Sequence, residues 1–174
     1  MKAIMMSIRP EWIAKILNGE KTIEIRKKFP SDYVGWVYIY CTKDSKNGWC
    51  MVSFRKSRKH YYQRFSKDAC YSPLDNYIGN GKVVARFWCD KVEEMYYCDE
   101  QYLKPSCLSI HEMFDYLKDK TGYAIHITGL EIFDKPREIK EFSKKEFDSF
   151  ITGQIEHYKC PLTRAPQSWC YVEI

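Results

Sequence analysis

The chain has 174 residues, of which 45% are apolar and 29% are charged, a balance typical of a globular protein and not of a disordered or membrane-embedded one. A chain of this length buries roughly 70% of its unfolded surface on folding, so we expect one domain spanning residues 1–174. The formal net charge of +5 is a modest excess, which permits binding to a polyanion without demonstrating it.

The first predicted elements are a strand and a short helix. Met1–Ser7 predicts an opening strand. Pro10 suits the first turn of a helix, and the apolar residues that follow it return to one face at helical spacing. Gly19 is expected to end this helix, because a residue without a Cβ atom enters the left-handed backbone region easily. The apolar face consists of Ile13, Ile16 and Leu17.

The next segment predicts a strand with one buried face. From Thr22 to Arg26 polar and apolar residues alternate strictly, which is the period of a half-buried strand. Ile23 and Ile25 are therefore expected to point into the interior. Thr22, Glu24 and Arg26 then share the opposite face, each about 7 Å from the next along the strand, so that the three side chains can line one groove.

The rest of the chain predicts mainly strands, and hence an α+β fold class. Residues 43–80 contain many turn signals and predict a long loop or insertion. Two capping-box spacings, Ser109 with Glu112 and Ser143 with Glu146, predict two further short helices. The β-branched and aromatic segments that are expected to form strands are Val34–Cys41, Trp49–Phe54, Lys82–Val92, Tyr123–Glu131 and Trp169–Ile174.

A basic patch lies inside the predicted insertion. The stretch from Phe54 to Lys67 contains several lysines and arginines and no acid, and aromatic residues are interleaved with the cations. The cations suit an RNA backbone, and the rings suit stacking on unpaired bases. A solvated loop that its aromatic residues tether to the domain is an equally good interpretation. The candidate nucleic-acid contacts are Arg55, Lys56, Arg58, Lys59, Tyr61, Tyr62 and Arg64.

The cysteine and histidine positions argue against a metal site. The chain has eight cysteines, but none of them have the CxxC spacing of a zinc site, so we expect free thiols, no metal and no cofactor. No apolar stretch reaches the roughly 20 residues of a membrane span, and no export signal is seen, which predicts a cytoplasmic protein without a membrane partner. Cys89 is expected to be a small buried apolar side chain. His126 is either a catalytic base or a buried, hydrogen-bonded imidazole, and the second is the commoner case.

The predicted helix end and the strand after it carry a family resemblance. The segment from Gly19 to Arg26 reads GEKTIEIR and has the form GxKxxExR, which closely resembles the signature of the ASCH family. Matching flanks extend the resemblance over most of the chain except the basic segment, and the chain looks like the small ASCH proteins of bacteria and their prophages. The resemblance implies a PUA-like fold, a small mixed β-barrel flanked by short helices, with Lys21, Glu24 and Arg26 in a cleft.

These three residues suit a nucleic-acid or nucleotide ligand. Arg26 offers a planar fork of donors to a phosphate or a base edge, and Lys21 offers a compact cation. Glu24 between them is suited to orient Arg26, to accept hydrogen bonds from an amino-bearing base, or to move a proton. Arg9 and Thr22 are further candidate ligand contacts. An exposed cross-strand ion pair is the alternative interpretation, and the family pattern favours the site.

Two functional classes follow from the resemblance. ASCH proteins are generally proposed to act on RNA, which favours an RNA-binding or modified-nucleoside-binding domain with a cationic cleft. The alternative is a small hydrolase, either a metal-independent ribonuclease or an amidohydrolase of acylated cytidine, with Lys21 and Glu24 as catalytic residues. Similar amidohydrolases carry a threonine three positions after the motif lysine, where this chain has Glu24, and this weakens the amidohydrolase alternative. The expected partner is RNA, a nucleotide or a nucleoside, and the sequence leaves the oligomeric state open.

Overall fold

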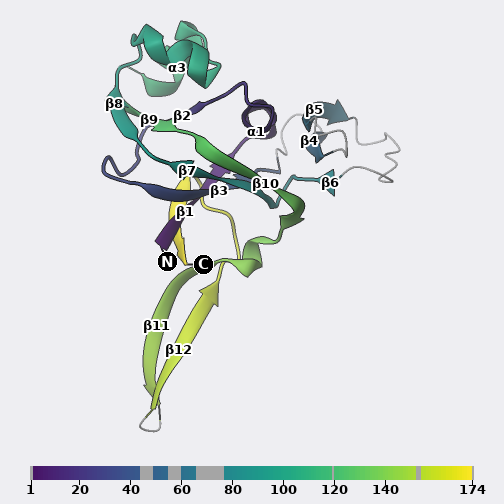
Figure 1. Ribbon diagram of the computed structural model, residues 1–174, viewed down its shortest axis with the longest axis vertical. Coiled ribbons are helices and arrows are strands. Elements are labelled where there is room, and N and C mark those ends of the chain that lie inside the picture. Colours follow the sequence, from purple (N-terminus) through teal and green to yellow (C-terminus); the bar gives the residue numbers. More distant parts are fainter. Residues whose placement is uncertain are drawn as a thin grey trace.

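The computed structural model describes residues 2–43, 49–54, 60–65, 77–118, 120–151 and 154–173, with side chains described outside 49–78 and 145–159. The strands of this part of the chain form three sheets (Figure 1), with the orders β10-β7-β3-β1-β13-β11-β12, β2-β9-β8 and β5-β4-β6. The strands are β1 (Lys2–Ile8), β2 (Ile23–Arg26), β3 (Gly35–Cys41), β4 (Trp49–Phe54), β5 (His60–Phe65), β6 (Tyr77–Ile78), β7 (Val83–Cys89), β8 (Val92–Met95), β9 (Gly122–His126), β10 (Thr128–Arg137), β11 (Ser143–Ile151), β12 (Gln154–Pro161) and β13 (Trp169–Glu173). The helices are α1 (Pro10–Leu17), α2 (Leu103–Ser106) and α3 (Ile110–Leu117), with short 3-10 turns η1 (Glu100–Tyr102) and η2 (Ile139–Glu141).

β1 lies at the centre of the largest sheet and is buried on both faces. It pairs in parallel with β3 and antiparallel with β13, the closing strand. Ile4 and Met6 pack with apolar residues of α1 in one cluster, whereas Ala3 and Met5 pack in another. Because both faces are covered, the strand has a continuous apolar sequence and not an alternating one. The chain passes directly from β1 into α1, so Ser7 and the start of that helix lie at the same end of the sheet.

β2 is an edge strand of the β2-β9-β8 sheet, called the small sheet below, and is also buried on both faces. Ile23 and Ile25 pack into an apolar cluster with Met113 and Leu117 of α3, which confirms that these isoleucines point into the interior. Since successive side chains of a strand point to opposite faces, Glu24 and the other charged residue of β2 face away from this cluster. Figure 1 shows β2 between α1 and α3.

Most of the predicted elements are confirmed within a few residues. α1 ends just before Gly19, whose φ of +77° is the left-handed conformation expected there. α3 begins at a complete capping box, in which Ser109 and Glu112 bond to each other's backbone amides. Two long predicted strands are each divided in the structure: residues 82–92 between β7 and β8, and residues 123–131 between β9 and β10.

The helix predicted from Ser143 and Glu146 is wrong. Both residues lie in β11, whose backbone is described throughout and pairs with β12 along most of its length. Ser143 also pairs with β13, so the backbone hydrogen bonds of the segment go to other strands. These tertiary pairings outweigh a local spacing that fits a helix start. In Figure 1 β11 and β12 form a hairpin that projects from the rest of the molecule.

The predicted insertion contains regular structure. β4 pairs antiparallel with both β5 and β6, and α1 lies beside β4 and β5 (Figure 1). Of the basic patch, Tyr61, Tyr62 and Arg64 have their backbone in β5. The remaining candidate contacts of the patch stay predictions, because Arg55, Lys56, Arg58 and Lys59 lie outside the described residues.

The fold class is α+β, as expected, with a mixed sheet and few short helices. Within the described residues the largest sheet begins at β10 and ends at β12. Its hydrogen bonds therefore do not close it into the complete barrel that the PUA-like expectation implied. In the same residues no helix is both long enough and apolar enough to cross a membrane.

Candidate functional site

The motif residues are brought together by the turn that follows α1. The amide of Lys21 donates to the Lys15 carbonyl oxygen at 3.1 Å, which folds the chain back after the helix. An added Cβ on Gly19 would meet nothing within 4 Å, so the left-handed backbone, and not crowding, is what favours glycine in this turn. Lys21 then precedes β2, and Glu24 and Arg26 project from one face of that strand.

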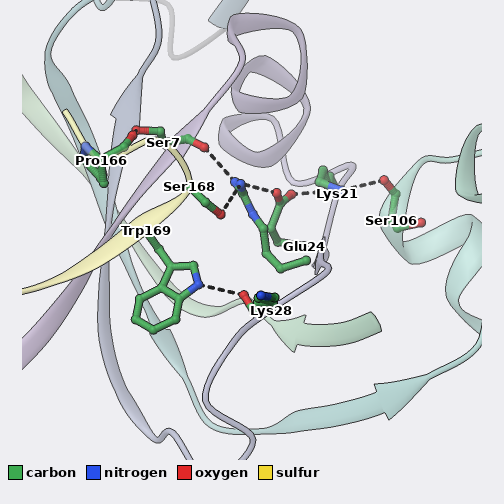
Figure 2. A network of polar contacts seen from close by, with 9 residues as sticks. Ser7, Lys21, Glu24, Lys28, Ser106, Pro166, Ser168 and Trp169 are labelled. Atoms are coloured by element: carbon green, nitrogen blue, oxygen red, sulfur yellow. Dashed lines mark hydrogen bonds and ion pairs between the residues drawn. The ribbon is translucent and has the colours of Figure 1, made fainter. Parts of the chain in front are cut away.

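Lys21, Glu24 and Arg26 form one ion-paired network (Figure 2). The Nζ atom of Lys21 lies 3.3 Å from Glu24 Oε2, and the Nη2 atom of Arg26 lies 3.0 Å from Glu24 Oε1. Each carboxylate oxygen therefore contacts a different cation. Lys21 Nζ also donates to the carbonyl oxygen of Ser106 at 2.7 Å, which joins the network to α2.

Arg26 connects this network to β1 and to the segment just before β13. Its Nη2 atom donates to the Ser7 carbonyl oxygen at 2.7 Å, and its Nη1 atom lies 3.4 Å from the hydroxyl of Ser168. The amide of Ser7 donates to the Ser168 carbonyl oxygen at 2.9 Å, so the two serines are themselves held together. The site is therefore assembled from β1, β2 and the segment before β13, where Ser168 lies 142 residues after Arg26 (Figure 2).

The network is buried and carries an excess of positive charge. Lys21, Glu24 and Arg26 are 3%, 7% and 9% exposed, so they are not the exposed cross-strand pair of the alternative interpretation. Two cations against one carboxylate leave one net positive charge. Among the residues that the structure describes, the buried Nε atom of Arg26 has no hydrogen-bond partner, which is rare for polar atoms in protein interiors. Both features suit the approach of an anionic group.

Two aromatic side chains from different helices flank the network. Trp12 of α1 has the ammonium of Lys21 at 5.4 Å from its ring centroid, and Tyr116 of α3 has the ammonium of Lys27 at 5.0 Å. Burial raises the pKa of the Tyr116 phenol above its ordinary value, although the nearby charge of Arg26 acts in the opposite direction. Tyr116 therefore stays protonated at neutral pH and lies close enough to Arg26 to sense its charge.

Of the two remaining candidate contacts, Arg9 borders the network and Thr22 does not contribute a side chain to it. Arg9 is exposed at the start of α1, two residues after Ser7, and its charge acts on Tyr116. Thr22 is exposed, its amide donates to the Pro105 carbonyl oxygen within α2, and its carbonyl oxygen accepts from the amide of Ile127, just after β9. Arg9 thus adds an accessible cation beside the buried ones.

His126 lies on the opposite face of the small sheet from Glu24. It pairs with Ile23 in the β2–β9 register, which places it on the isoleucine face. The ring is half-buried, with its Nε2 atom 2.6 Å from Glu93 Oε2. Hydrogen bonds from Lys91 and from His126 lower the pKa of the Glu93 carboxyl group. His126 is therefore a hydrogen-bonded histidine of a separate cluster.

The described cysteines are free thiols. Cys89 is fully buried, as predicted, and this burial raises its pKa to about 11. Within the described ranges no group of three or more His, Cys, Asp and Glu side chains is placed to hold a metal ion.

Sequence reasoning missed several residues that surround the motif. Ser7 and Ser106 contribute backbone carbonyl oxygens, which no side-chain pattern reveals. Ser168 lies in the closing segment, and Trp12 lies in the helix that leads into the motif. Their positions in the sequence could therefore have suggested that they lie near the motif. The position of Tyr116 in the sequence gives no such indication, because α3 and β2 come together only in the tertiary fold.

The architecture and the network together define the class of protein to which the chain is similar. It has the α+β fold of ASCH proteins, with the GxKxxExR segment running from the end of α1 through an edge strand that is buried on both faces. The expected likeness to the ASCH family is thereby confirmed at the level of the fold.

The solved structures that show this likeness come from Zymomonas mobilis. The ASCH protein of that bacterium superposes with a TM-score of 0.59 at 15% identity, over 98% of this chain and 87% of the other. A serine-to-alanine variant gives the same values, and a tyrosine-to-phenylalanine variant gives 0.53 at 14% identity, over 78% and 75% of the two chains. No protein-family model and no curated protein sequence matches the chain.

Proposed function

We propose that this chain binds RNA or a nucleotide through the Lys21–Glu24–Arg26 network, which receives an anionic group of the ligand. One observation carries the proposal: a buried network with one net positive charge, in which Arg26 Nε has no hydrogen-bond partner within the described part of the chain. An uncompensated charge in a protein interior is costly. A bound phosphate would neutralise the excess charge and accept the unused hydrogen bond.

The chemistry of the network favours phosphate among possible anions. The guanidinium of Arg26 is planar and offers several donors, which matches the oxygens of a phosphate group. Glu24 and the Ser7 carbonyl oxygen hold that guanidinium in one orientation through contacts of 3.0 and 2.7 Å. Arg9 adds an exposed cation next to it. Such a preoriented group loses little conformational freedom when a ligand binds.

Two further observations point to RNA as the source of the phosphate. The resemblance to ASCH proteins implies a nucleic-acid ligand, and the fold is that of an ASCH structure. The chain also has a net positive charge of +5, which favours association with polyanions. Resemblance and charge together therefore favour RNA as the ligand class.

Binding is tested with an exposed residue, because changes at the buried cations also perturb the fold. Fluorescence anisotropy would measure the affinity of wild type and of Arg9→Ala for a labelled single-stranded RNA over a range of salt concentrations. We expect weaker binding by Arg9→Ala and a salt slope smaller by about 0.7, as for one lost phosphate contact, with an unchanged melting temperature.

Lys2→Ala supplies the matched control for this experiment. Lys2 is also exposed, and its removal changes the net charge equally, but it lies about 17 Å from Ser7 along β1 at the usual rise per residue. We expect it to bind RNA as wild type does. Equal losses in the two variants would show that binding depends on net charge alone and would contradict the proposed site.

Turnover is measured in the same preparation. The Lys21–Glu24 contact of 3.3 Å is suited to proton exchange, but Glu24 also holds Arg26, so we propose a binding role for it. Wild type and Glu24→Gln are incubated with labelled RNA and with acylated cytidine. Products that form with wild type and not with Glu24→Gln would replace the binding proposal by the hydrolase alternative.

A further inference from the structure

Lysine side chains cover the two aromatic rings that flank the network. The ring of Trp12 has the ammonium of Lys15 at 4.9 Å from its centroid, in addition to that of Lys21. The ring of Tyr116 has the ammonium of Lys27 at 5.0 Å. Tyr116 is 37% exposed, and Lys27 is exposed as well. Both rings therefore carry a cation that can move aside.

The two rings belong to helices on either side of β2. Trp12 is on α1 and stands at the Lys21 end of the network, whereas Tyr116 is on α3 and stands at the Arg26 end. Figure 1 shows the same arrangement, with β2 between α1 and α3.

We propose that Tyr116, together with Trp12, selects ligands that carry a nucleobase next to the bound phosphate, by stacking a base in the place that Lys27 or Lys15 occupies. This inference rests on the proposed function, since the phosphate must be held by the Lys21–Glu24–Arg26 network. It adds a specificity residue, because a sugar phosphate without a base satisfies the network equally well.

The exchange of a lysine ammonium for a stacked base on the ring is favourable, because stacking is the stronger of the two interactions. A cation over an exposed aromatic ring contributes about two- to fivefold to an equilibrium constant. A base stacked on an aromatic side chain contributes about 5- to 140-fold. A base therefore displaces the lysine at a net gain, and the displaced ammonium remains available to the ligand's phosphates.

The Tyr116 hydroxyl gives the same ring a second role. Tyr116 is 37% exposed, and a phenolic hydroxyl can donate one hydrogen bond to an acceptor on the ligand. Tyr116 then offers a face for stacking and an edge for one hydrogen bond.

The proposal is tested with two probes of equal charge, a single-stranded RNA hexamer and a sugar–phosphate hexamer that lacks the bases. Wild type is expected to bind the hexamer with bases at least fivefold more tightly by isothermal titration calorimetry. Tyr116→Ala should reduce that ratio toward one, mainly by weakening the hexamer with bases. Tyr116→Phe retains the ring and should keep most of the ratio.

Tyr171→Ala is the matched control. Tyr171 is 39% exposed and has the ammonium of Lys2 at 5.6 Å from its ring centroid, so its surroundings resemble those of Tyr116, but it lies on β13 and not beside the motif. This variant should keep the wild-type ratio. An equal loss of the ratio in both variants would overturn the proposal.

The remaining outcomes separate this inference from the function on which it rests. If wild type binds neither hexamer, the proposed function fails. If it binds both hexamers equally, the function stands and the role of Tyr116 is refuted. Should Tyr116→Ala not fold, Lys27→Ala decides instead: uncovering the ring should raise the ratio between the probes, and an unchanged ratio refutes the role of Tyr116.

Discussion

Replacing Glu24 by glutamine tests the buried network at its centre. The change keeps the size of the side chain but removes the only negative charge that contacts both Lys21 Nζ and Arg26 Nη2 within the described network, at 3.3 and 3.0 Å. The two cations then remain in a site that is at most 9% exposed. Breaking a buried ion pair by removing one partner costs about 3–5 kcal/mol. For a chain of this length such a loss lowers the melting temperature by about 6–20 °C.

Thermal and urea unfolding followed by circular dichroism measure this loss. Glu131→Gln is the control, since Glu131 pairs with Arg86 at 2.7 Å but its side chain is 49% exposed, and an exposed pair contributes at most about 1 kcal/mol. A loss below about 1 kcal/mol for Glu24→Gln would refute the conclusion that the network is desolvated. The triple replacement of Lys21, Glu24 and Arg26 by methionine, leucine and methionine should lose less than the sum of the three single changes, because it leaves no unpaired charge.

Three further predictions concern other parts of the fold. Glu93→Gln should make the free energy of unfolding depend less on pH in the acid range. The pKa of Glu93 is lowered, so its carboxylate stabilises the fold above its ordinary pKa of about 4.5. This stabilisation is lost as the pH falls through the lowered pKa. Gly19→Ala should cost about 1 kcal/mol in chemical denaturation, from the left-handed backbone alone. In alkylation followed by mass spectrometry, exposed Cys98 should react within the folded protein and buried Cys41, whose pKa burial raises, should react only after unfolding.

Local patterns in the sequence predicted the part of the fold that positions the motif. The alternation in β2 gave the correct faces, because an apolar cluster buries Ile23 and Ile25 while the charged residues turn away. The end of α1 followed from Gly19, whose φ is positive. Both features depend on a few neighbouring residues, and a single sequence contains that information.

The parts that failed depend on pairing between distant segments. The spacing of Ser143 and Glu146 fits a helix, but β12 supplies the hydrogen bonds that make the segment a strand. The isoleucine face of β2 was predicted, whereas the burial of its charged face was not, because that burial comes from β1 and from the segment before β13. Tyr116 enters the site through α3, more than 80 residues after the motif in the printed sequence, and no local pattern records that approach.

The buried network is an inefficient way to stabilise this fold, and this bears on what it does. Apolar side chains such as those of Ile23 and Ile25 fill one face of β2 and need no compensation. The opposite face instead carries Glu24 and Arg26, which together with Lys21 leave one net positive charge, and the Nε atom of Arg26 has no hydrogen-bond partner among the described residues. A polar arrangement that lowers stability and leaves hydrogen bonds unused is typical of a functional site. The triple replacement should therefore keep the chain folded while it removes the groups that we propose to receive the phosphate, so stability and RNA affinity should separate.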